Sequence, residues 1–418
     1  MKNFARIFLL LTGVLLLAHY LPAAFWLIAD QRQRVPTVFY SCLEKNFLLF
    51  RSERGEIVRT DRQGKTYDRD EFERLLPLDN YLQLYKDGRM PKEIDGVAIT
   101  PEKLRRERVN VRLKPEVLDT PSVALTPLLE TESGRVRLEM PGDFMRLGAT
   151  IEFVDAKSNR LLPEKSVQFQ RAFAAAGFAF PVKLVGSNPT TLKPYDEGCF
   201  LVDAKDVVFR LRQIRGEAEL VRLVELAPTE QKTQWAELQP RYIHVQEQDN
   251  REIHALIIGR DNRAHLVVGN EQRLVTLPLK KFDPATMQLT VRGDLLNRLV
   301  VVSSAEYVEA VALNRDYSLL DRYTEMLVAR AGRPSGQLAG ALFPFTLDLE
   351  SDTSGFLGFN FEWGNRWVIV LNAILLAALV GWAALRKQAW RLRMPDLVAV
   401  AGGGVFGLIT VLVLPKTE

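Results

Sequence analysis

Two uninterrupted apolar runs close to the C-terminal end dominate the hydrophobic pattern of the chain. They cover Trp367–Leu385 and Leu397–Leu414, and each is 18 to 19 residues long. A helix needs about 20 apolar residues to cross a hydrocarbon core of about 30 Å. The pattern therefore predicts one transmembrane helix at 367–385 and a second within 397–418, followed by a short tail.

A third apolar run, Ile7–Ala29, follows the basic residues Lys2 and Arg6. It continues beyond the length of a signal peptide, so we expect an uncleaved transmembrane helix in residues 1–30. The turn at 386–396 carries four basic residues, which are Arg386, Lys387, Arg391 and Arg393. Basic residues concentrate in cytoplasmic loops. The sequence thus predicts a multi-pass protein of the bacterial inner membrane, with a cytoplasmic N-terminus and an outer C-terminal tail.

The intervening residues, 31–366, form a predicted extracytoplasmic domain that is mainly β. Short apolar or alternating runs with β-branched residues predict strands at Val38–Tyr40, Phe47–Phe50, Val109–Leu113, Val207–Leu211, Tyr242–Val245, His254–Ile258, His265–Val268, Leu299–Val302 and Val308–Leu313. Proline and glycine signals at the ends predict a few short helices at Asp68–Leu76, Asp79–Asp87 and Glu164–Ala176.

A strand–turn–strand pattern recurs around Asp155, Asp203, Gly259 and Asn314, at steps of 48, 56 and 55 residues. Such a period, with several strands in each unit, is typical of β-propeller blades, and the domain has room for about six units. Ordinary β-meanders share the same turn chemistry and produce a similar pattern. A propeller-like fold and a two-domain sandwich or mixed β arrangement therefore both stay open.

The composition of the chain and its lack of known motifs exclude several kinds of functional site. The chain has only 2 Cys and 4 His, which argues against a metal centre or an Fe–S cluster. Its net charge is only +4, which argues against a nucleic-acid-binding surface. A tight turn would pair Ile258 with His265 and keep His254 too far away to share a metal ion. Nucleophile-elbow, zincin, P-loop and dinucleotide-binding motifs are absent from the sequence. We expect no enzyme activity, no cofactor, and two buried free cysteines, although a Cys42–Cys199 disulfide is an alternative.

The most loop-like part of the outer domain is Val185–Phe200. It offers hydroxyl, amide and carboxylate groups for contact with a ligand or partner at Asn188, Thr190, Thr191, Asp196 and Glu197. A well-capped connection into the next strand would use the same residue types.

Small residues recur every four positions in the last two apolar runs, a spacing that lets membrane helices pack closely. They are Ala373, Ala377 and Gly381 in one run and Gly403 and Gly407 in the other. Packing within the chain and packing against another subunit are both open at these positions.

Several stretches resemble an uncharacterised bacterial family with a domain of unknown function. They are Glu139–Pro141, Asn188–Thr191, Lys193–Pro194, Asp196–Gly198 and Phe343–Leu347, while Cys199 stands where the family pattern has an aromatic residue. The resemblance implies a membrane protein with a large extracytoplasmic domain that associates with ABC-transporter components. It implies no catalytic residue and no substrate.

Two functions follow from these observations. The first is a non-enzymatic accessory or permease-type subunit of an inner-membrane ABC-type transport complex, with the lipid bilayer, an ATPase and a permease as partners. The second is a membrane-anchored extracytoplasmic receptor or sensor for a small molecule that the sequence does not identify. The short cytoplasmic segments leave little room for a signalling output, which favours the first function.

Overall fold

The computed structural model describes residues 2–29, 35–53, 56–120, 125–349, 354–356, 358–385 and 394–414. The chain forms two compact units. One comprises Val35–Glu325 and is built of sheets, and the other combines Met1–Arg34 with Met326–Glu418 and contains the long apolar helices. Each is described by itself.

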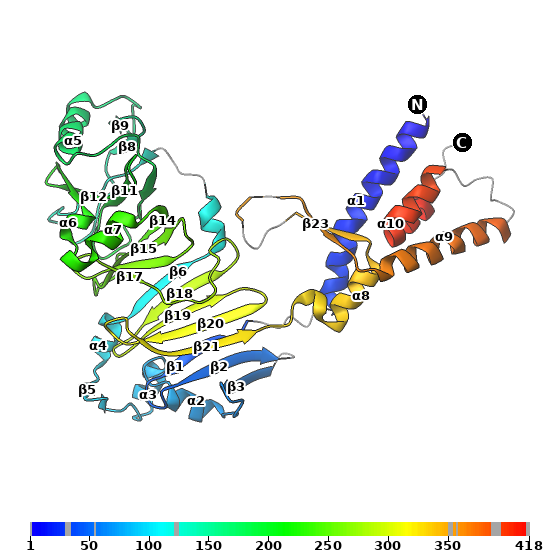
Figure 1. The fold of residues 1–418 in the computed structure, drawn as a ribbon, viewed down its shortest axis with the longest axis horizontal. Coiled ribbons are helices and arrows are strands. Elements are labelled where there is room, and N and C mark those ends of the chain that lie inside the picture. The colour runs from blue at the N-terminus through cyan, green and yellow to red at the C-terminus, as the bar shows by residue number, and fades with distance from the viewer. Residues whose placement is uncertain are drawn as a thin grey trace. The chain divides into compact units, whose positions relative to one another are not determined.

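Five sheets make up most of the first unit (Figure 1). Two of the sheets have three strands. One contains β1 (Thr37–Ser41), β2 (Asn46–Glu53) and β3 (Glu56–Asp61). The other contains β7 (Leu125–Thr126), β8 (Asp143–Leu147) and β9 (Ile151–Asp155). Two further sheets have four strands. One contains β10 (Leu184–Gly186), β11 (Cys199–Val202), β12 (Val208–Ile214) and β13 (Glu217–Arg222). The other contains β14 (Pro240–Val245), β15 (Ile253–Gly259), β16 (Ala264–Val268) and β17 (Arg273–Thr276). The fifth has the order β21-β20-β19-β18-β6, with β6 (Val109–Leu113), β18 (Gln288–Gly293), β19 (Arg298–Ser303), β20 (Tyr307–Leu313) and β21 (Leu319–Met326).

Short helices and one small hairpin connect these sheets. They are α2 (Arg69–Leu75), α3 (Tyr81–Lys86), α4 (Pro101–Arg106), α5 (Pro163–Ala175), α6 (Leu223–Leu226), α7 (Lys232–Glu237) and the β4–β5 pair (Glu93–Ile94 with Val97–Ala98). Local capping explains why the sequence predicted three of them. The Asp68 side chain accepts the N–H of Glu71 at the start of α2, and Gly88 and Gly177, each with φ +67°, follow α3 and α5.

The sheets pack face to face in a row. The β10–β13 sheet shares one core with α5 and the β7–β9 sheet, and a second core with the β14–β17 sheet. A third core lies between the β14–β17 sheet and the five-stranded sheet. Ion pairs Arg51–Glu325 and Arg62–Asp321 then join the β1–β3 sheet to β21.

Burial on both faces explains the sequence of the inner strands. Every residue of β11 and β15 is buried, because alternate side chains enter different cores. In β15, Ala255 and Ile257 contribute to the second core, whereas Leu256 and Ile258 contribute to the third. A strand covered on both sides reads as a continuous apolar run.

The predicted repeat corresponds to hairpins with the same turn chemistry. Asp203 Oδ1 accepts the N–H groups of Lys205 and Val207, and Asn314 Oδ1 accepts those of Asp316 and Ser318. The two four-stranded meanders have the strand order of a blade. The described sheets nevertheless do not close into a ring or barrel, so the mainly β fold is confirmed and the propeller is not.

Two finer expectations concern β15 and the cysteines. The structure pairs Ile257, not Ile258, with His265, so the predicted register was wrong by one residue because the turn after Gly259 is longer than two residues. Cys42 and Cys199 are free and buried, as expected, and they belong to separate cores.

The second unit holds three helices that are long and apolar enough to span a membrane: Phe4–Ala29 within α1 (Lys2–Ala29), α9 (Trp367–Leu385) and α10 (Met394–Val413). The unit also contains α8 (Pro334–Leu342) and a hairpin of β22 (Phe345–Asp348) and β23 (Asn360–Trp363). These smaller elements pack on α1, where Phe25 contacts Phe343 and His19 Nδ1 lies 2.9 Å from the main-chain oxygen of Leu347.

Candidate functional site

The predicted contact loop lies between β10 and β11 and folds against the end of β14 and the start of β15. Gly198 makes its entry into β11 possible. Its φ is +84°, and a Cβ at this position would lie 2.2 Å from the main-chain oxygen of Leu211 in β12. A side chain therefore fits neither the backbone conformation nor the space.

Lys193 is the centre of a buried polar cluster in this loop. Its ammonium group donates to Asp196 Oδ1 at 2.7 Å, to Glu247 Oε1 at 2.7 Å and to the main-chain oxygen of Asn188 at 2.8 Å. An ammonium has three donors, so all of them are used. The Lys193 and Asp196 side chains are each 3% exposed and that of Glu247 is 0% exposed. Three charges this deeply buried depend on one another for compensation.

Glu247 joins the remaining parts of the loop. Its Oε1 also accepts the N–H of Glu197 at 2.7 Å, and its Oε2 accepts Asn188 Nδ2 at 2.7 Å. Asp196 Oδ2 accepts the Thr131 hydroxyl at 3.1 Å. Burial raises the pKa of Glu247 above its ordinary value, although the hydrogen bonds from Lys193 and Glu197 oppose it.

Glu197 extends the cluster onto the β-sheets. Its Oε1 accepts Arg210 Nη1 from β12 at 2.8 Å, and its Oε2 lies 3.2 Å from His254 Nδ1 of β15. Burial raises the pKa of Glu197, but His254 and Arg210 outweigh this effect and hold it below the ordinary value. Three sequence-distant segments are thereby tied together at the junction of two sheets.

Two polar side chains at the cluster have atoms without a hydrogen-bond partner among the described residues. They are the hydroxyl of Tyr195 and the imidazole of His254, whose approach to Glu197 is close but not aligned as a hydrogen bond. The Arg251 guanidinium stacks 4.2 Å from the centre of the Tyr195 ring. These atoms can accept or donate to a water molecule or a small polar ligand.

The cluster offers no activated nucleophile. The nearest candidate is the Cys199 thiol, and burial followed by the charge of Asp196 raises its pKa to about 12. A thiol with such a pKa is protonated at neutral pH and is a poor nucleophile. Across the described residues, no three His, Cys, Asp or Glu side chains are placed to hold a metal ion.

A family model for a domain of unknown function, DUF4857, matches residues 37–313. The chain belongs to the DUF4857 family. The matched region runs from β1 to β20 and contains the whole polar cluster, whereas the three long apolar helices lie outside it. Comparison with curated proteins and with solved structures finds no match. The expected family of unknown function is confirmed, and membrane and ABC-transporter association stay predictions.

The structure brings three of the five predicted contact residues of the DUF4857 domain together. Asn188, Asp196 and Glu197 meet in the polar cluster. Thr190 and Thr191 are half-buried in the same loop, and Thr190 Oγ1 accepts the N–H of Leu192 in a local turn. Whether these residues contact a ligand stays a prediction.

Sequence reasoning did not find Glu247, Arg210 and His254 as members of the cluster, because they lie 13 to 59 positions from the loop residues they contact. A signal existed for Arg210, since it interrupts the apolar run Val207–Leu211. A charge within a buried strand indicates a buried partner.

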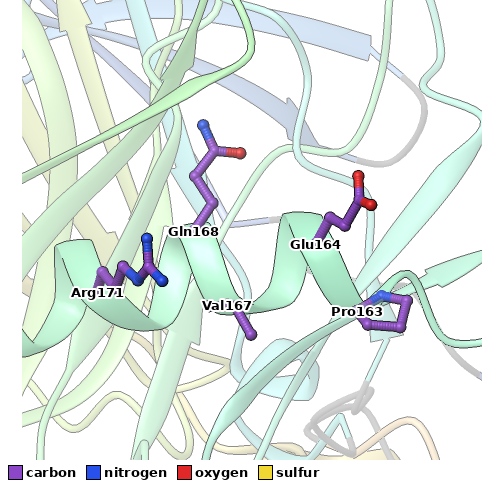
Figure 2. Close-up of a pocket in the computed structure, with 5 residues that line it drawn as sticks. All are labelled: Pro163, Glu164, Val167, Gln168 and Arg171. Atoms are coloured by element: carbon purple, nitrogen blue, oxygen red, sulfur yellow. The ribbon is translucent and has the colours of Figure 1, made fainter.

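A hollow of about 440 Å³ lies beside α5 of the DUF4857 domain (Figure 2). One helix alone supplies its lining, which is Pro163, Glu164, Val167, Gln168 and Arg171. Gln168 donates to Glu217 at its edge, and the other side chains follow the exposed side of the helix. The hollow is a shallow surface feature without convergent polar groups.

The small residues predicted to pack membrane helices fall into two different environments. Gly403 lies against α1, where a Cβ would be 3.4 Å from Val14, and Gly407 lies against Ala399 of its own helix. Ala373, Ala377 and Gly381 instead follow the exposed side of α9. A Cβ on Gly381 would meet nothing within 4 Å.

The opposite side of α9 supplies its contacts with the rest of the unit. Asn372, Leu379 and Ala383 are buried there, and Asn372 Nδ2 donates to the main-chain oxygen of Ala401 at 3.1 Å. The four basic residues predicted to set the topology, Arg386, Lys387, Arg391 and Arg393, lie outside the described residues.

Proposed function

We propose that the protein is a non-enzymatic accessory or permease-type subunit of an inner-membrane ABC-type transport complex. The exposed small-residue side of α9 carries this proposal. Ala373, Ala377 and Gly381 are spaced at four positions, so they lie on one side of the helix. No described residue of the chain covers that side at Gly381.

Membrane physics explains why such a side favours a partner helix. Apolar helices gain no hydrophobic free energy from association in lipid, so close van der Waals packing must hold them together. Small residues allow two backbones to approach closely. Because the chain itself packs on the other side of α9, we propose a transmembrane helix of another subunit as the occupant of this one.

The first unit, Val35–Glu325, supports a binding and scaffolding role over catalysis. Its sheets share continuous cores and form one compact unit. The charged groups of its polar cluster are paired with one another, and the nearby thiol is protonated. The ABC-type partner is the one that the family resemblance implies.

A test compares two variants in the full-length protein. Ala377→Leu adds bulk to the small-residue side, and Ala378→Leu adds the same bulk at an exposed neighbouring position of α9. Both proteins are purified in mild detergent from their native host, and the subunits that accompany them are identified by mass spectrometry. We expect the wild type and Ala378→Leu to retain an ATPase or permease subunit and Ala377→Leu to lose it.

Two outcomes would refute the proposal. A wild-type protein that purifies alone, under conditions that preserve known ABC complexes of the same host, has no such partner. Equal retention of the partner subunit by the wild type and both variants would show that the partner does not bind at the small-residue side of α9. Far-ultraviolet circular dichroism and gel filtration show whether each variant is folded, so loss of a partner is separated from loss of structure.

The second candidate function, an extracytoplasmic receptor for a small polar molecule, is favoured by the Tyr195 hydroxyl and the His254 imidazole, which make no hydrogen bond among the described residues. A ligand seated there would hydrogen-bond to both and raise the thermal stability of the protein. Thermal-shift screening of the full chain with polar metabolites tests this, with Tyr195→Phe and His254→Phe as controls. A shift that survives both substitutions would exclude this cluster as the site.

A further inference from the structure

The last apolar helix, α10, is broken in its middle. Gly404 has φ +51° and ψ −125°, which is not helical. Gly407 lies so close to Ala399 that a Cβ would be 1.9 Å from the main-chain oxygen of Ala399. In a straight helix, positions 399 and 407 are about 12 Å apart. The arms 394–403 and 405–413 therefore lie against each other and run in opposite directions.

The contacts of the hairpin with the first helix, α1, show how far the hairpin extends along that helix. The Arg6 guanidinium contacts both of its ends, because Nη2 lies 2.9 Å from Asp396 Oδ1 and Nη1 lies 3.4 Å from the main-chain oxygen of Leu414. The tip lies further along, where Gly403 faces Val14. Eight residues of α1 separate these two levels, a rise of about 12 Å, which is less than half of a hydrocarbon core of about 30 Å.

Packing supports the broken backbone at the tip. Gly404 is buried, and a Cβ at this position would lie 2.1 Å from Asn372 Oδ1 and 2.8 Å from Pro344 Cγ. Non-helical backbone is tolerated at membrane depth only where it is buried in protein or lines a water-filled cavity. The positive φ and the lack of space both require glycine at this position.

Shared contacts hold the two arms together. Val400 and Val411 belong to one apolar cluster with Leu10 and Leu379, although eleven residues separate them in the sequence. At the open end, Arg6 and Asp396 form an ion pair in which the side chains are 4% and 1% exposed. A buried arginine with a carboxylate partner at the mouth fixes both arms at one level of α1.

We infer that α10 is a re-entrant hairpin that enters and leaves the membrane on the side where α1 begins. Residue 414 then lies on the same side as Arg6 and as Met394, where α10 begins. This differs from the tail position predicted by counting apolar residues, because the count does not register the reversal at Gly404. The inference does not depend on which side is cytoplasmic or on the proposed partner.

Single cysteines in a Cys42→Ala/Cys199→Ala background test the inference in the full-length protein. Thr417→Cys reports the tail, Gln388→Cys reports the α9–α10 segment, and Val136→Cys, at a fully exposed position, reports the first unit. Each is treated with a membrane-impermeant maleimide in intact cells and in inverted vesicles. We expect Thr417→Cys to be labelled from the same side as Gln388→Cys. Labelling from the side of Val136→Cys would overturn the inference.

A cross-link tests directly whether the two arms of the hairpin lie close together. In a straight helix, positions 400 and 411 are about 17 Å apart. A bismaleimide shorter than this should join Val400→Cys to Val411→Cys within one molecule if the arms fold together. Val368→Cys with Leu379→Cys is the matched control, because it has the same spacing in unbroken α9. Cross-linking of neither pair, or of both equally, would refute the folded arms.

Discussion

Replacement of Lys193 by methionine removes the one ammonium group that compensates Asp196 and Glu247. Methionine keeps most of the side-chain length, so the change is mainly electrostatic. Both carboxylates remain almost fully buried. Removing one partner from a buried ion pair typically costs about 3–5 kcal/mol, because the other charge is left without compensation. We expect a loss of this size in the free energy of unfolding at neutral pH.

A matched control separates this effect from the loss of any lysine. Lys183 pairs with Asp206 at 2.9 Å, but the two side chains are 34% and 22% exposed. Exposed pairs contribute about 0–1 kcal/mol. Lys183→Met should therefore change the free energy of unfolding by no more than about 1 kcal/mol.

The cost of Lys193→Met should also depend on pH. Burial already raises the pKa of Glu247, and the variant loses the Lys193 contacts that oppose this shift. A group whose folded pKa is raised contributes stability at low pH and loses it as pH rises through the folded value. Hence we expect the deficit to be smaller at mildly acidic pH than at mildly alkaline pH. Glu197, whose pKa is lowered, is present in both the wild type and the variant, so its titration is common to the two proteins that are compared.

Urea unfolding followed by tryptophan fluorescence suits this measurement. Trp235 is the only tryptophan between residues 35 and 325, and it is buried with its Nε1 donating to the main-chain oxygen of Gln272. A deficit for Lys193→Met no larger than that of Lys183→Met, or one that does not change with pH, would contradict the interpretation of the cluster as mutually compensated buried charges.

Three further predictions concern other positions. Gly198→Ala should destabilise the domain by about 1–3 kcal/mol in the same urea assay, because its positive φ and the Leu211 oxygen exclude a Cβ. Cys42 and Cys199 should resist maleimide in the native protein even at mildly alkaline pH and react after unfolding, since burial raises both pKa values to about 12. Gly403→Leu should lower the thermal stability of the purified protein in detergent, because it forces α1 and α10 apart; unchanged melting would contradict internal packing there.

Local signals predicted the secondary structure well, for physical reasons that can be named. Asp68 caps α2 through its own side chain, and glycine follows α5 in a left-handed conformation. Val109–Leu113 alternates and forms β6 with the predicted bounds. These features depend on residues a few positions apart, so a sequence displays them directly.

Arrangement over longer distances was harder to predict. The recurring turn carries an Asp or Asn whose side chain organises its own hairpin, and this chemistry is the same in an open row of sheets and in a closed ring. The polar cluster depends on Glu247, 54 positions from Lys193, and no periodicity connects the two. Gly404 is hidden in an apolar run that has the composition of an ordinary membrane helix.

The two small-residue series show why neighbours, and not spacing, decide what such a motif does. Gly403 and Gly407 face α1 and the first arm of α10, so their small size serves the fold of this chain. Ala377 and Gly381 lie on the side of α9 that the described residues leave exposed, so their small size is available to another helix. The two functions are therefore separable. A bulky substitution at Ala377 should remove a partner without changing the side on which the tail is labelled, and a substitution at Gly404 should disturb the tail while the exposed side of α9 keeps its composition. Coupled loss of both properties in either variant would show that the hairpin and the partner surface form one structure.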